Sequence, residues 1–368
     1  MMSSGLFDTT TLNAPGALQP AGFGGWLAFL WTFVCLMAVW HFTTVIGDGR
    51  ALEIMFDSPA NASIMRAVLW IKVWMWGPFL ILAPLGHRLT RASAVVATLV
   101  VTLGEGYAVI HLFEMDTFKA LAVNAFNAST AIVVFAYLAF SKRIATYRES
   151  QRRADIRARR HFPLFLLVIG GVSIVVFAAP AGNAIDRVSI LTAWQFLLLL
   201  AVVLLIGPVR LLRTGRVRKN MYLRRDFGIW AGITGLMHLF AGLGESMTPA
   251  YFLEFVNAAG EAAAAYRQPL FMWATIVGLV IGVMVLLLLT LSNDAAMRRF
   301  GIRWWKRLQR GSYGIFALTA VHAVAFQMLE GRARWAMVAT ALLIGLVVAV
   351  QCAAVIASGR RRERRGSQ

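Results

Sequence analysis

Long apolar runs separated by short polar segments make up most of the chain. About ten of the runs have roughly 20 residues, the length that an α-helix needs to cross a bilayer. They fall at residues 24–46, 62–85, 92–113, 120–140, 162–181, 190–212, 226–245, 269–292, 309–330 and 335–358. Because lipid cannot hydrogen-bond to backbone groups, a spanning segment is a helix or part of a closed barrel, and such long runs exclude strands. The pattern predicts an all-α, polytopic transmembrane bundle of about ten helices.

A polar segment at residues 141–161 interrupts this pattern and marks the predicted domain boundary. It is basic, and we expect it to be a helical cytoplasmic linker at the membrane surface. Residues 1–140 then form a leading four-helix membrane region, and residues 162–358 form a six-helix unit. Residues 359–368 form a basic cytoplasmic tail.

Most of the positive charges lie in a few segments between the apolar runs. Besides the linker, these are residues 210–225, 298–310 and 360–365. Because Lys and Arg concentrate in cytoplasmic loops, these segments are expected to face the cytoplasm, which places both termini there. The longest loop, residues 242–268, holds three Glu and one Arg and is expected on the outer side of an inner (plasma) membrane.

Composition then excludes two function classes. The net charge is +19, but the basic residues lie in short loops and do not form a continuous face, which argues against a nucleic-acid partner. Cys35 and Cys352 lie in apolar runs, so neither a disulfide framework nor a CxxC motif is available. The lipid bilayer is the partner that the composition predicts, since 59% of the residues are hydrophobic.

Two histidines lie deep within predicted spans of the six-helix unit. His238 and His322 follow the predicted inner helix starts by 12 and 13 residues. At about 1.5 Å per residue, the two rings can meet at one level, nearer the outer face. Imidazole is a common axial ligand of heme iron, so a b-type heme between these helices is one interpretation. Two hydrogen-bonded packing histidines are the alternative.

A family resemblance rests on three stretches of the six-helix unit. These read TAWQFLLLLAVVLLIGPVRLL at 192–212, RRDFGIWAGITGLMHL at 224–239 and LTLSNDAAMRRFGIRWWKRLQRGSYGIFALTAVH at 289–322. They resemble the ferric-reductase-like transmembrane family, and within it the heme-binding membrane subunits of bacterial methionine-sulfoxide reductase systems. The resemblance implies a heme b between the third and fifth helices of the unit, ligated by His238 and His322.

One position departs from the family pattern and limits the expected number of hemes. Relatives usually carry another histidine thirteen residues before the fifth-helix ligand, where this chain has Gln309. The corresponding position on the other helix is Arg225, which is no iron ligand either. We therefore expect one heme, near the outer face, with electrons entering from a quinol or a flavin donor in the membrane or at its surface.

The basic turn before His322 is the second feature that the resemblance interprets. Arg303 and Arg307 are the residues expected to bind the phosphate of FMN. The alternative is a basic turn that only fixes topology, beside interfacial Trp304 and Trp305. No GxGxxG motif follows a strand, so the resemblance implies transfer to an outer-face acceptor or a periplasmic reductase partner and not a self-contained NADPH oxidase.

The leading helices carry ionisable residues that support a different function. Lys72 and Glu105 lie at similar depth in predicted spans, where an unpaired charge is costly, so the two are expected to pair. They would serve a cofactor-free transporter or channel, or a proton or quinone site at Glu105. His41 and His111 are candidates for a second heme or a metal. Two further histidines are expected in solvated inner loops, namely His87 and His161.

Overall fold

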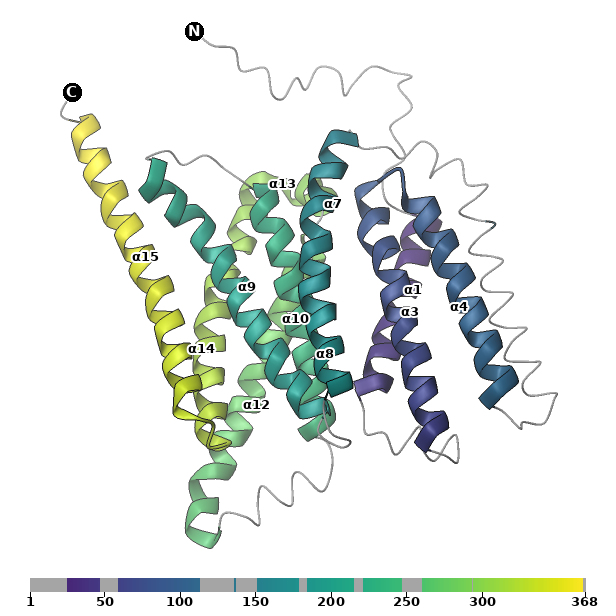
Figure 1. Ribbon diagram of the computed structural model, residues 1–368. Coiled ribbons are helices and arrows are strands. Elements are labelled where there is room, and N and C mark those ends of the chain that lie inside the picture. Colours follow the sequence, from purple (N-terminus) through teal and green to yellow (C-terminus); the bar gives the residue numbers. More distant parts are fainter. Residues whose placement is uncertain are drawn as a thin grey trace, which may run out of the picture. The chain divides into compact units, whose positions relative to one another are not determined.

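The computed structural model describes residues 25–46, 59–112, 136, 151–178, 184–214, 221–246, 260–292 and 294–366 (Figure 1). These residues form helices and contain no strand, which confirms the all-α prediction. Within these ranges, seven helices are long and apolar enough to cross a membrane, so the chain is a multi-pass membrane protein. The span predicted at 120–140 lies outside the described residues, apart from Ala136.

The chain divides into two compact units, and the division falls between Phe162 and Pro163. The first unit contains α1 (Gly25–Ile46), α3 (Pro59–Leu85), α4 (Thr90–Leu112) and most of α7 (Gln151–Phe165). The second unit contains the π-helix η2 (Leu166–Gly170), α8 (Gly171–Ala178), α9 (Ala184–Thr214), α10 (Met221–Ser246), α12 (Gly260–Thr290), α13 (Asp294–Gln309), α14 (Gly311–Leu329) and α15 (Arg334–Gly366).

The first unit is a helical packing built on α3. A tight turn at Gly86, whose φ of 61° suits glycine, returns the chain from α3 to α4. Pro84 has no N–H, so the Leu80 carbonyl loses its usual partner within the helix. Trp31 of α1 donates its Nε1–H to that carbonyl at 2.9 Å. The proline therefore creates an acceptor that ties α1 to α3.

Two histidines expected in solvated loops are in fact buried, because α7 packs against α3. The exposed fractions are 8% for His87 and 6% for His161. Ala154 and Ala158 of α7 form an apolar cluster with the end of α3. His87 lies beside this cluster and contacts the Asp155 carboxylate, with 2.8 Å between Nε2 and Oδ1. The expectation of solvated histidines was therefore wrong, since it treated residues 151–161 as an unpacked linker.

A π-helical turn continues α7 in the second unit. Pro163 interrupts the hydrogen-bond ladder, and the five residues of η2 follow shortly after it. Gln195 of α9 donates Nε2–H to the Leu167 carbonyl of η2 at 3.3 Å. A Cβ at Gly171 would lie 3.1 Å from that Nε2 atom, so glycine allows the close approach.

The remainder of the second unit packs around α9 and α10. Helix α9 lies against α8, α10, α14 and α15, while α12 lies against α10 and α14. Pro208 frees the Leu204 carbonyl of α9, just as Pro84 frees Leu80 in the first unit. Gln351 of α15 donates Nε2–H to Leu204 O at 2.9 Å. The helices α9, α10, α12 and α14 together surround the candidate site.

Candidate functional site

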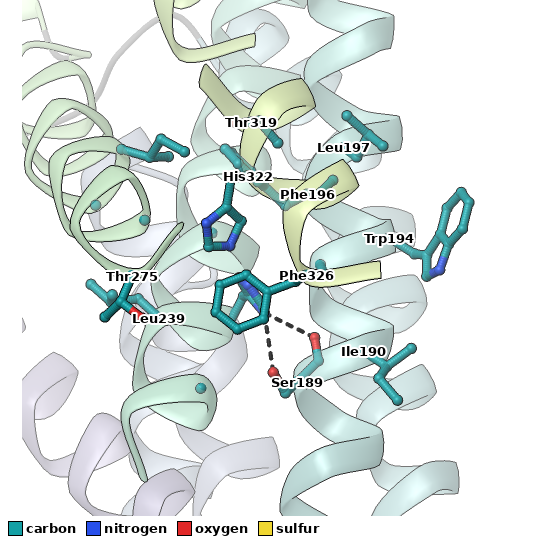
Figure 2. A pocket seen from close by; sticks show the side chains of 18 of the residues that line it. Ser189, Ile190, Trp194, Phe196, Leu197, Leu239, Thr275, Thr319, His322 and Phe326 are labelled. Atoms are coloured by element: carbon teal, nitrogen blue, oxygen red, sulfur yellow. Dashed lines mark hydrogen bonds between the residues drawn. The ribbon is translucent and has the colours of Figure 1, made fainter. Parts of the chain in front are cut away.

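The His238 and His322 rings meet inside the second unit. His238 lies on α10 and His322 on α14, and their ring centroids are 6.1 Å apart with an angle of 80° between the planes. The expectation that the two rings reach one level is confirmed. Figure 2 shows His322 at the cavity wall, with Phe326 next to it and Ser189 on the neighbouring helix.

A backbone carbonyl from a neighbouring helix orients each ring. The Nδ1 atom of His238 lies 2.9 Å from Ser189 O and 3.3 Å from Ser189 Oγ, contacts drawn as dashed lines in Figure 2. The Nδ1 atom of His322 lies 2.9 Å from Ala274 O. A carbonyl only accepts, so Nδ1 must carry the proton in both rings. The Nε2 atoms are then left with free lone pairs in the neutral imidazoles, as in histidines that bind metals.

A glycine makes room for one of the rings. A Cβ at Gly278 of α12 would lie 2.8 Å from His322 Cε1 and 3.2 Å from Nδ1. Real Cβ atoms do not approach so closely, so any larger residue at position 278 would displace the imidazole. Gly278 is therefore the position that allows the His322 ring to reach the carbonyl of Ala274.

A cavity of about 160 Å³ opens beside the two rings. Its walls are mostly apolar and come from α9, α10, α12 and α14, with Thr340 from α15. Three polar atoms of lining residues are buried without a partner among the described protein atoms: Thr275 Oγ1, Thr319 Oγ1 and Gln327 Oε1. Buried polar atoms are normally satisfied, so these three indicate bound water or a ligand nearby. The Phe326 ring, which also lines the cavity, packs on the His322 ring with the centroids 4.8 Å apart.

Charged groups gather at the cavity end beyond Leu329. Arg332 pairs with Glu330, and its Nη2 lies 3.7 Å from Asp186 Oδ1. Burial raises the pKa of the Glu330 carboxyl, although the nearby guanidinium opposes this shift. Glu330 and Arg332 are the charged residues among those described as lining the cavity.

The donor set tests which metal group the site could hold. Across the residues that the structure describes, no cluster of three or more His, Cys, Asp or Glu is present. Metal–imidazole bonds are about 2.0–2.1 Å long, so two rings on opposite sides of one ion have centroids about 6 Å apart. The observed centroid distance of 6.1 Å is close to this separation.

The basic turn is exposed and partly ordered by tryptophan. Arg303 and Arg307 are exposed, four residues apart on α13, and the Arg307 guanidinium lies 5.0 Å from the Trp304 ring centroid. Trp304 is 61% exposed, whereas Trp305 is buried and donates Nε1–H to Leu291 O at 2.8 Å. The interfacial interpretation therefore fits Trp304 and is wrong for Trp305, which joins α13 to the end of α12.

The ionisable residues of the first unit are only partly described. Lys72 and His41 are both 7% exposed, and Lys72 is among the charges that act on the His41 ring. The Nδ1 atom of His41 is buried without a partner among the described atoms. The side chains of Glu105 and His111 lie outside the described residues, so neither expected pair is tested.

Sequence reasoning found both imidazoles but missed the residues that orient them. Ser189 and Ala274 act through backbone carbonyls, which any residue type supplies. Gly278 is one of several glycines in an apolar helix. Arg332 did have a signal, since two cationic residues, Arg332 and Arg334, follow closely after the apolar run that carries His322.

Comparisons with known proteins give no further guide: no family model, curated protein or solved structure matches this chain.

Proposed function

We propose that this chain is an integral-membrane electron-transfer protein that holds one heme b between His238 and His322. The proposal rests on the paired imidazoles, whose ring centroids lie 6.1 Å apart while both Nδ1 atoms bond to carbonyls. Neutral rings oriented in this way offer two Nε2 lone pairs to one iron. When bound, the heme would supply one-electron redox chemistry.

The chain's own residues would set the properties of this centre. Ser189 and Ala274 hold the rings and raise their basicity as ligands. The apolar lining from α9, α10 and α12 excludes water and so influences the reduction potential. The Phe326 ring lies against His322 and adds to the apolar surroundings of that ring.

The direction of electron flow follows from topology and from the resemblance. The positive-inside rule, applied to the basic segments, favours cytoplasmic termini and an inner membrane, and the histidines would then lie nearer the outer face. Electrons would pass from a quinol or a flavin toward an outer-face acceptor or a periplasmic reductase partner. Arg303 and Arg307 lie four residues apart on one exposed face of α13, which suits the phosphate of an FMN donor.

A reduced-minus-oxidised absorption spectrum of the detergent-purified chain tests this proposal. We expect a b-type spectrum with one heme per chain. His238→Ala and His322→Ala should each abolish it, since one remaining imidazole leaves the iron without its second ligand. His41→Ala is the matched control, because it removes a buried histidine of the first unit and should leave the spectrum unchanged. Two hemes per chain, or loss of the spectrum in the control, would contradict the proposal.

A cofactor-free transporter or channel is the second candidate. The buried ammonium of Lys72, 7% exposed within apolar α3, favours it, because charges inside membrane spans usually serve a function. This candidate predicts a colourless protein whose transport depends on Lys72 and not on His238. The same spectrum therefore separates the two candidates.

A further inference from the structure

One end of the cavity carries charged side chains that take no part in orienting the two imidazoles. Among the residues described as lining it, Arg332 is the cationic one, and its side chain is 25% exposed. Its Nε and Nη2 atoms contact Glu330, and Nη2 also faces Asp186. A guanidinium has five N–H donors, so these contacts leave donors available for a further anion.

The backbone fixes Arg332 at this position. The chain turns at Gly331, whose φ is 59°, directly after α14. The Arg332 N–H then donates to Gln327 O at 3.1 Å, and the Glu330 N–H donates to Phe326 O at 2.9 Å. The turn is therefore tied to the last residues of α14, where a helix terminus also favours positive charge. Arg332 and His238 both line the cavity.

A heme bound between the two histidines would bring carboxylates into this cavity. Heme b carries two propionate groups, and burying a carboxylate without a partner is costly. Because the other walls are mostly apolar, the charged end is the favourable place for such a group. Glu330 follows His322 by eight residues, or about 12 Å along the helix, so the charged end lies within two to three turns of the ring.

We propose that Arg332 anchors a heme propionate, and that Glu330 and Asp186 hold the guanidinium in place until the carboxylate arrives. This inference rests on the proposed function. Arginine suits the role because its planar fork bonds to a carboxylate through two N–H groups.

Hemin and hemin dimethyl ester, which has no free carboxylates, test the anchor directly. The full-length apoprotein is loaded with each, and the release rate is measured by transfer to an excess of a heme scavenger. Wild type should release hemin about tenfold more slowly than the ester, as expected for a charge-assisted hydrogen bond. Arg332→Gln should release both hemin and the ester at the rate at which the wild type releases the ester.

Glu330→Gln separates an anchor from a purely structural ion pair. If Arg332 only braces the fold, loss of either partner should speed the release of hemin and of the ester alike. If Arg332 is the anchor, Glu330→Gln removes a competing carboxylate, so hemin should leave no faster than from wild type. Arg332→Lys keeps the charge without the fork, and should retain only part of the difference between the two ligands.

The outcomes distinguish the two levels of the proposal. A wild-type chain that binds neither hemin nor its ester overturns the proposed function. A chain with a b-type spectrum that releases both ligands equally fast overturns the anchor alone. The anchor is also overturned if Arg332→Gln still releases hemin more slowly than the ester, to the same degree as the wild type. The comparison of hemin with its ester in the wild type needs no variant. The anchor can therefore be tested even if a substituted chain fails to fold.

Discussion

At the scale of single residues, the site depends on atoms that are not characteristic of any residue type. The carbonyls of Ser189 and Ala274 fix which nitrogen of each imidazole carries the proton. The missing side chain of Gly278 lets one ring reach its carbonyl. A histidine at a suitable depth is therefore only part of the site, and its orientation comes from helices far away along the chain.

Gly278→Ala should damage the site without disturbing the rest of the bundle. The new methyl group would lie 2.8 Å from His322 Cε1, so the ring must move and lose its bond to Ala274. We expect heme affinity to fall at least about tenfold, as for loss of a partner that orients a ligand. Titration of the apoprotein with hemin measures this.

The matched control is Gly345→Ala on α15, where an added Cβ meets nothing within 4 Å. Alanine is the better helix former, by up to about 1 kcal/mol, so this variant should be at least as stable as wild type and bind hemin normally. Equal affinities in both variants would show that the space at Gly278 has no role in ring placement.

At the scale of elements, proline and a donor from a neighbouring helix act as a pair. Leu80 and Leu204 each lie four residues before a proline, and each carbonyl accepts from a side chain of another helix. This arrangement satisfies a backbone acceptor that lipid cannot satisfy. It also selects which helices become neighbours, namely α1 with α3 and α9 with α15.

Gln351→Leu should lower stability because it leaves the Leu204 carbonyl without a partner. Loss of one partner of a buried hydrogen bond costs about 1–3 kcal/mol. In a Pro208→Ala background the restored backbone N–H can bond to Leu204 O, so the same substitution should cost clearly less. The free energy of unfolding is measured in detergent, by titration with a denaturant. The four proteins compared are the wild type, the two single variants and the double variant. Equal costs in both backgrounds would show that the two residues act independently.

The hydropathy pattern predicted most helices, because their length follows from the thickness of the bilayer. It did not predict that residues 151–161 belong to a packed helix. Their charges suggested a solvated linker, whereas Ala154 and Ala158 form an apolar cluster with the end of α3. The hydropathy pattern also did not predict that α10 begins at Met221. The residues just before Asp226 are polar, so the apolar run starts later than the helix does.

At the scale of the whole molecule, every residue of the candidate site belongs to the second unit. The imidazoles, their carbonyl partners and the charged cluster all lie after Pro163. The first unit has separate polar chemistry, centred on Lys72, His41 and the pair formed by His87 and Asp155. None of the described residues of the first unit lines the cavity.

A chain that begins at Gln151 should therefore retain the b-type spectrum. This truncation keeps all of α7 and removes Lys72, His41 and His87, none of which lines the cavity. Absorption of the purified fragment, with its His322→Ala variant as the blank, measures the outcome. A fragment that folds with full helicity by circular dichroism but takes up no heme would mean that the first unit supplies a missing part of the site.

The hydrogen bond between Gln351 and Leu204 spans 147 positions of the chain and so has a consequence for biosynthesis. When α9 leaves the translocon, the Gln351 amide that donates to Leu204 O in the folded chain has not yet been synthesised. The helices between α9 and α15 must enter the bilayer before this hydrogen bond can form. Nascent chains stalled before Gln351 are therefore expected to be recognised and degraded by membrane quality control, even though both histidines are already in place.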